Sequence, residues 1–191
     1  AAIGAGIDIS QPSGRMVIDI GGGTADIAVI SFSGVVVSTS VKMGGDKFDE
    51  AIVRYVRKKH KVLIGERTAE QIKKQIGCVT ARPKELLVKV KGRCMVTGLP
   101  KQITLSSEEA REAVQECAAA IGDAARRVLE ETPPELASDI FLNGVVMTGG
   151  GSLIYGIDRY LADVLSVPVS VAERAEECVG VGTGESLQFI S

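Results

Sequence analysis

Two runs of three consecutive glycines constrain this 191-residue chain more than any other feature. Residues 21–23 follow an apolar segment that ends at Ile20, and residues 149–151 follow Thr148. Glycine adopts backbone conformations that other residues avoid, so the N–H groups of such a loop can turn toward an anion. Each run predicts a tight loop that a phosphate or a flat ring can approach closely. Each run alone is also typical of an ordinary tight turn.

The composition is that of an ordinary globular protein, with 45% hydrophobic and 24% charged residues. This balance excludes a disordered chain, which combines low hydrophobicity with high net charge. The net charge of −2 argues against a nucleic-acid-binding surface. No apolar run approaches the roughly 18 residues of a membrane-spanning helix, so we expect a soluble, cytoplasmic protein.

The cysteine pattern favours reduced thiols over a metal site. The four cysteines are widely spaced, form no C-x-x-C pair and are accompanied by one histidine, His60. A Ser–His–Asp triad is not expected either, because His60 lies in a run of basic residues and no G-x-S-x-G motif occurs.

The first third of the chain predicts three strands followed by helices. Residues 15–20, 26–32 and 35–41 are rich in β-branched residues and have short connections, which predicts an antiparallel meander. The first glycine run therefore connects strand to strand. A helix is predicted from Asp46, as its N-cap, to about Lys59.

The middle of the chain carries two capping-box patterns. Thr68 with Gln71 predicts the start of a short helix, and Ser106 with Glu109 predicts the start of the longest one. That long helix runs to about Glu131, where two prolines end it. Strands are predicted over 85–91 and 103–105.

After the prolines, residues 144–148 predict a buried strand and Ser152 the N-cap of the next helix. A short strand follows over 167–171, and a last helix is predicted over 185–189. The whole order indicates a mixed α/β domain, in which residues 44–107 form an insertion.

The glycine runs do not match the common nucleotide fingerprints. The third glycine of G-x-G-x-x-G is replaced by Asp26 after the first run and by Ile154 after the second, and no Walker loop occurs. Instead, residues 19–24 resemble the second phosphate loop of the actin/Hsp70/sugar-kinase superfamily. Residues 146–152 resemble its adenosine motif.

Four further stretches are similar to one branch of that superfamily, the MreB family of bacterial actin-like rod-shape proteins. They are GGDKFDE at 44–50, GERTAE at 65–70, TGLP at 97–100 and TPPEL at 132–136. The likeness spans nearly all of the chain, and the motifs are specific only when taken together.

The resemblance implies an α/β fold: an RNase H-like, actin-type ATPase domain with a mixed sheet, flanking helices and a smaller inserted α/β subdomain. Residues 8–43 and 108–177 would form the large subdomain, and residues 44–107 the inserted one. Residues 1–7 and 178–191 would be crossover segments that pack on a first domain outside this sequence.

The resemblance also implies ATP and Mg²⁺ as cofactors. The phosphate contacts would come from Asp19, Gly21, Gly22, Gly23 and Thr24, with Asp19 holding Mg²⁺ through water and Thr24 orienting the attacking water. The ribose and adenine contacts would come from Gly45, Glu70, Gln71, Lys73, Gly149, Gly150, Gly151, Ser152 and Leu153.

Glu70 and Lys73 fit such a role physically, since residues three apart share one face of a helix. A carboxylate can accept hydrogen bonds from ribose hydroxyls while the lysine stem covers the edge of the base. Without the resemblance, the two would be taken for an ordinary surface ion pair.

The function that follows is that of a filament-forming cytoskeletal protein. It would polymerise at the inner face of the cell membrane and direct cell-wall synthesis and rod cell shape. Its partners would be further copies of itself and membrane-linked morphogenesis proteins such as RodZ, with membrane contact through the first domain and no nucleic acid.

The catalytic glutamate of the family precedes a stretch that matches the start of this chain, Ala1–Gly6. The intact protein would be a slow ATPase coupled to polymerisation, and this chain alone would bind ATP weakly without hydrolysing it. One departure from the pattern is Cys94, where relatives usually carry aspartate. The alternatives are an ATP-binding half of an Hsp70-type chaperone or sugar kinase, and a stand-alone interaction module.

Overall fold

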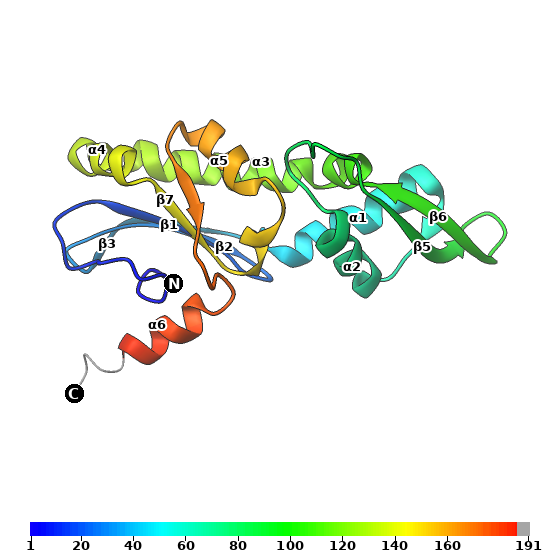
Figure 1. The fold of residues 1–191 in the computed structure, drawn as a ribbon, viewed down its shortest axis with the longest axis horizontal. Coiled ribbons are helices and arrows are strands. Elements are labelled where there is room, and N and C mark those ends of the chain that lie inside the picture. The colour runs from blue at the N-terminus through cyan, green and yellow to red at the C-terminus, as the bar shows by residue number, and fades with distance from the viewer. Residues whose placement is uncertain (187–191) are drawn as a thin grey trace. The chain divides into compact units, whose positions relative to one another are not determined.

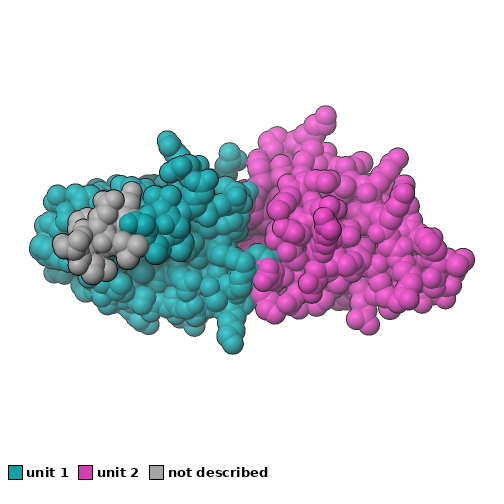
Figure 2. Space-filling view, turned by 90° about the horizontal axis from the view of Figure 1, so that it is seen from below, with its two compact units in different colours: residues 1–45, 120–153, 158–191 teal, residues 46–119, 154–157 magenta. Residues whose placement is uncertain are grey.

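The computed structural model describes residues 1–186, and their contacts divide the chain into two compact units (Figure 2). Unit 1 contains Ala1–Gly45, Ala120–Leu153 and the chain from Asp158 onward. Unit 2 contains Asp46–Ala119 and Ile154–Ile157. No helix among the described residues combines the length and apolar character needed to cross a membrane.

Unit 1 is built on a mixed five-stranded sheet with the order β3-β2-β1-β7-β8 (Figure 1). The first three strands pair antiparallel, which confirms the predicted meander, whereas β7 pairs parallel with both β1 and β8. The strands are β1 Arg15–Ile20, β2 Ala25–Ser31, β3 Gly34–Val41, β7 Val145–Thr148 and β8 Val169–Val171.

The strand β1 lies at the centre of this sheet and carries its core. Met16, Ile18 and Ile20 of β1 are buried. Helices flank the sheet in Figure 1, with the C-terminal helix on the side of the N-terminus. These helices are α3 Ser107–Glu131, α4 Pro134–Asn143, the 3₁₀ helix η1 Gly150–Leu153, α5 Ile157–Leu165 and α6 Cys178–Ser186.

Unit 2 combines two helices, the first half of α3 and a small antiparallel sheet of order β4-β5-β6. Phe48, Ile52 and Ile72 are fully buried members of its core. Its elements are α1 Gly45–His60, β4 Val62–Leu63, α2 Glu66–Ile76, β5 Leu87–Cys94 and β6 Pro100–Ser106.

The first half of α3, up to Ala119, belongs to unit 2. The first half of α3 groups with α1 because several side chains join the two helices. His60 Nε2 lies 2.8 Å from Glu109 Oε1, and the Tyr55 hydroxyl donates to Glu112. The Cys117 thiol lies 3.6 Å from the carbonyl oxygen of Lys47.

Three predicted helix caps are wrong. The helix α1 begins at Gly45, so Asp46 lies in its first turn and is not its N-cap. The helix α2 begins at Glu66 with Gly65 at its N-cap, so Thr68 lies inside the helix and caps nothing. Glu66 itself places a negative charge in the first turn, where the helix dipole favours it. Ser152 lies in η1, five residues before Ile157, where the next helix begins, and its hydroxyl donates to the Gly149 carbonyl (2.7 Å).

The sequence patterns do not predict α4, because two consecutive prolines after a helical stretch indicate only that the stretch ends there. Pro134 occupies the first turn of α4, where its missing N–H would have no partner in any case. At the other end of the chain, α6 begins at Cys178 rather than at residue 185. The predicted continuation of that helix to residue 189 lies outside the described residues.

Candidate functional site

The first glycine run forms a tight loop between β1 and β2. The N–H of Gly21 donates to the carbonyl oxygen of Thr24 (2.9 Å), which closes the turn. Gly22 and Gly23 are exposed. Their backbone N–H groups are therefore placed where a loop of this kind can bind an anion.

The start of α1 packs directly on this loop. The N–H of Gly45 donates to the carbonyl oxygen of Gly21 (2.8 Å). A Cβ atom on Gly44 would lie 2.5 Å from the carbonyl oxygen of Gly22, closer than real Cβ atoms come. Glycine at position 44 is therefore required for the two segments to touch.

The second glycine run closes against the end of β1. Gly149 has a φ of +82°, and a Cβ atom there would lie 2.3 Å from the carbonyl oxygen of Ile20. A Cβ atom on Gly151 would lie 2.3 Å from the side chain of Ile20. Unit 1 thus brings the predicted phosphate loop, Gly45 and the predicted adenosine loop into one place.

The remaining predicted residues of the second loop differ in exposure. Ser152 is buried and its hydroxyl is used within the loop, whereas Gly150 and Leu153 are exposed. Ser152 therefore shapes the loop from inside, and Leu153 offers an apolar surface. Thr148, just before the glycines, is fully buried and its hydroxyl has no hydrogen-bond partner among the described residues.

Two carboxylates lie side by side beyond the phosphate loop. Asp19 on β1 is the register partner of Asp26 on β2, so their side chains share one face of the sheet. Both line a cavity of about 710 Å³ on that face. The Thr24 hydroxyl donates to Asp26 Oδ2 (2.9 Å), which leaves the oxygen of Thr24 as an acceptor.

Asp26 was not among the predicted site residues, although the Thr-x-Asp spacing could have indicated it. The described residues contain no group of three or more potential metal ligands. Mg²⁺ is commonly held by one or two carboxylates together with substrate phosphates and water. Asp19, next to the predicted phosphate loop, has the carboxylate that such an arrangement requires.

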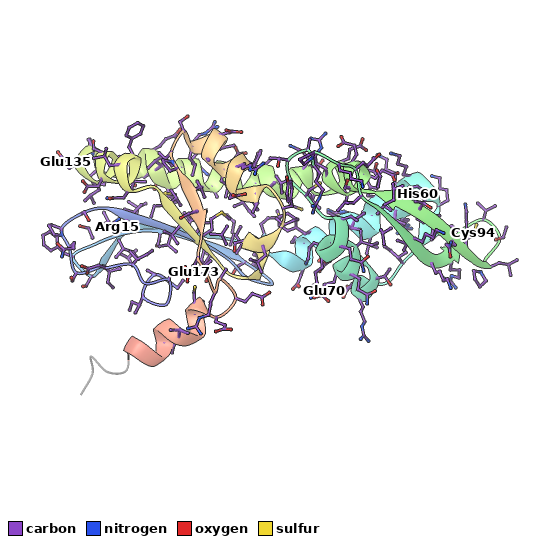
Figure 3. The ribbon with its side chains drawn as sticks, viewed as in Figure 1. Arg15, His60, Glu70, Cys94, Glu135 and Glu173 are labelled. Atoms are coloured by element: carbon purple, nitrogen blue, oxygen red, sulfur yellow. The ribbon has the colours of Figure 1, made fainter. Side chains whose placement is uncertain are left out.

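The predicted ribose and adenine residues of α2 belong to unit 2, and they are not each other's partners. Glu70 pairs with Lys74 (2.7 Å), on the exposed part of α2, whereas Lys73 Nζ binds Asp49 Oδ2 (2.9 Å). Gln71 is exposed. Figure 3 shows Glu70 on α2. The contact of Lys73 with Asp49, a residue of α1, was not predicted.

Cys94 lies where β5 enters the turn to β6 (Figure 3). Hydrogen bonds from the Thr97 side chain and from the backbone N–H groups of Thr97 and Val96 lower the pKa of its thiol to about 7. These are the donors that a carboxylate at the same position would use. Cys94 therefore supplies a hydrogen-bond acceptor at this turn.

Comparison with solved structures finds close matches among actin-like proteins. MreB5 of Spiroplasma citri bound to ADP superposes with a TM-score of 0.96 at 43% identity, covering 99% of this chain and 57% of that one. The same protein bound to AMPPNP gives a TM-score of 0.95. A double helical filament of MamK, at 20% identity and a TM-score of 0.77, shares the fold.

Comparison of sequences points the same way. The cell shape-determining protein Mbl of Bacillus cereus is 55% identical over 190 residues, which are 100% of this chain and 57% of the relative. The cell shape-determining protein MreB of Escherichia coli is 50% identical over 190 residues, covering 55% of its length. This chain therefore spans little more than half the length of these relatives. A model of the MreB/Mbl protein family matches residues 1–191, and the chain belongs to that family.

Proposed function

We propose that this chain is the ATP-binding half of an actin-like cytoskeletal protein that polymerises into membrane-associated filaments and directs cell-wall synthesis and rod shape. The observation that carries the proposal is the meeting of three glycine-rich segments in unit 1. Gly44 approaches the backbone of residues 21–22, and Gly149 and Gly151 approach Ile20 at the end of β1, more closely than a Cβ atom allows. The family membership supports it, and it gives no support to the chaperone and sugar-kinase alternatives.

The phosphates of the nucleotide are proposed to bind at the loop after β1. The exposed N–H groups of Gly22 and Gly23 are its donors, because the N–H of Gly21 closes the turn and the hydroxyl proton of Thr24 is given to Asp26. Asp19 would hold Mg²⁺ through water, and the ion would supply charge that offsets the phosphate oxygens. The structures of MreB5 with ADP and AMPPNP support a nucleotide at this fold.

The ribose and adenine are proposed to be contacted by Gly45, by Glu70, Gln71 and Lys73, and by residues 149–153. Gly149 and Gly151 let the second loop lie flat against the end of β1, so a planar base can approach its backbone. Exposed Leu153 offers apolar contact to such a base.

Hydrolysis in the intact protein is proposed to be slow and coupled to polymerisation. Thr24 would orient the attacking water, because its hydroxyl proton is given to Asp26 and its oxygen remains free to accept. This chain spans 57% of the length of its Mbl relative, and we propose that by itself it binds ATP weakly and does not hydrolyse it.

The partners are proposed to be further copies of the protein and membrane-linked proteins such as RodZ, at the inner face of the cell membrane. The filament of MamK, a relative in fold, supports self-association. Sedimentation of the intact protein with ATP, with ADP and without nucleotide tests this proposal. It predicts sedimentation that depends on ATP, and equal sedimentation in all three conditions would contradict it.

A further inference from the structure

Asp49 and Lys73 form the least exposed ion pair in the described part of the chain. Lys73 Nζ lies 2.9 Å from Asp49 Oδ2, and the two side chains are 17% and 11% exposed respectively. Asp49 projects from α1 and Lys73 from α2, so the pair joins the two helices of unit 2. The exposed ion pair between Lys47 and Glu50, one residue along α1, provides a contrast at 43% and 42%.

Joining two helices through this ion pair costs desolvation free energy. Burial raises the pKa of Asp49, and the hydrogen bond and charge of Lys73 offset that rise only in part; Glu70 and Asp46 add to it. Buried ion pairs commonly return no more energy than their desolvation costs, and apolar side chains of similar volume serve stability as well or better. We therefore look for the role of this pair in the position that it gives to the charged end of Lys73, not in its contribution to stability.

The carboxylate of Asp49 is directed at Lys73 alone. Its second oxygen, Oδ1, is buried and has no hydrogen-bond partner among the described residues. Because no second donor competes for the carboxylate, its charge acts on the lysine ammonium. The lysine side chain is only 17% exposed, so burial restricts the positions that its ammonium can take.

The neighbouring residues of α2 are held differently. Glu70 has a side chain that is 46% exposed, and it pairs with Lys74, which is 68% exposed. An exposed pair of this kind is easily exchanged for other contacts. Of the charged residues predicted to contact the ribose and adenine, Lys73 is therefore the one fixed in position before a nucleotide binds.

We propose that Asp49 is the positioning residue for Lys73: it holds the lysine ammonium where it contacts the ribose and adenine of a bound adenine nucleotide. This inference rests on the proposed function. Asp49 acts through Lys73, so removing Lys73 makes Asp49 irrelevant to nucleotide affinity.

The test is a double-mutant cycle on the 191-residue chain, with ADP and Mg²⁺ titrated to millimolar concentration. The changes are Asp49→Asn and Lys73→Met, singly and together. Asp49→Asn is expected to raise the Kd for ADP by about tenfold when Lys73 is present and to have no further effect beside Lys73→Met. The matched control is Glu50→Gln, the same chemical change on the next residue, with an expected effect under about twofold.

A variant that lacks both charges serves as the control for effects on folding stability. Asp49→Asn leaves a buried ammonium without its counter-charge and is expected to lower stability as well. The pair Asp49→Leu with Lys73→Met removes both charges, and we expect it to keep the thermal stability of the wild type. Its Kd for ADP should equal that of Lys73→Met alone.

An NMR measurement reports directly on the position of the Lys73 ammonium. The ¹⁵N–¹H signal of the Lys73 ammonium should be visible in the wild type, shift when ADP is added, and be lost or averaged in Asp49→Asn while it persists in Glu50→Gln. An ADP affinity that does not depend on Asp49, or a loss that is equal with and without Lys73, would overturn the positioning role and leave the proposed function standing. If the wild type shows no response to ADP at any concentration, both fail.

Discussion

The N–H of Gly45 donates a 2.8 Å hydrogen bond to the carbonyl oxygen of Gly21. This bond ties the first residue of α1 to the loop that follows β1. Gly149 packs against the end of the same strand, β1, where a Cβ atom on Gly149 would meet Ile20. Three segments that are far apart in the sequence therefore meet at the end of β1, and a Cβ atom at Gly44, Gly149 or Gly151 would disturb this packing.

The first prediction concerns the second glycine run. Gly149→Ala should lower the free energy of unfolding by about 2–4 kcal/mol, because a Cβ atom would lie 2.3 Å from the Ile20 carbonyl oxygen at a φ of +82°. Urea denaturation measures this change. Gly150→Ala is the matched control: its nearest neighbour is the flexible Glu176 side chain at 3.4 Å, so a loss as large as that of Gly149→Ala would contradict the account.

The second prediction separates contact from openness in the phosphate loop. Gly44→Ala should destabilise the chain by about 2 kcal/mol or more, because its Cβ atom would meet the backbone of Gly21 and Gly22. Gly23→Ala places a Cβ atom where nothing lies within 4 Å, and we expect a change within about 1 kcal/mol. Thermal melting curves of the two variants compare them, and equal losses would count against the described packing.

The third prediction is a pH dependence that arises from Glu109. Burial opposes ionisation of this side chain. Hydrogen bonds with the backbone N–H of Ser106 and with the side chains of His60 and Lys59 outweigh the effect of burial and lower the pKa of Glu109 below the ordinary 4.5. As pH falls past 4.5 the unfolded chain takes up this proton first, so the stability contributed by Glu109 is present above that pH and lost below it.

The measurement is chemical denaturation of the wild type and Glu109→Gln at pH 6 and at pH 3.5. The wild type should be the more stable at pH 6, and the difference should shrink at pH 3.5. Glu116→Gln, at an exposed position of the same helix, serves as the control and should show no such trend. A difference that grows on acidification would show that the sign is wrong.

The fourth prediction concerns thiol reactivity. Cys94 has a pKa of about 7, whereas burial raises the pKa of Cys78 and Cys117. Iodoacetamide at pH 7 should therefore label Cys94 well before those two in the folded chain. Thr97→Ala removes a side-chain donor and should slow labelling at pH 7, while Thr97→Ser should restore it; a rate that rises only above pH 8.5 in the wild type would refute the lowered pKa.

Local patterns predicted most of the elements, because their physical causes are local. The Ser106–Glu109 capping box is confirmed: Glu109 N–H donates to Ser106 Oγ (3.2 Å), and Ser106 N–H donates to Glu109 Oε2 (3.1 Å). Thr68 with Gln71 has the same spacing but lies inside α2. The spacing alone cannot tell the two apart, since the preceding glycine decides where α2 begins.

The candidate site was predictable only where glycine is obligatory. Glycines that are required by close packing can be recognised in the sequence as conspicuous glycine runs, as at positions 44, 149 and 151. An ion pair between residues of two different helices produces no recognisable pattern in the sequence. Asp49 is one of several acids near the start of α1, and its contact with Lys73 arises from tertiary packing.

The most direct test of the central claim is a titration of the ¹⁵N-labelled 191-residue chain with ADP and Mg²⁺, followed by the backbone amide signals. We expect the amides of residues 21–24 and 149–153 to shift together, with one binding curve, and Gly149→Ala to abolish the shifts at both loops. Amides of both loops that stay unchanged at millimolar ADP would contradict it.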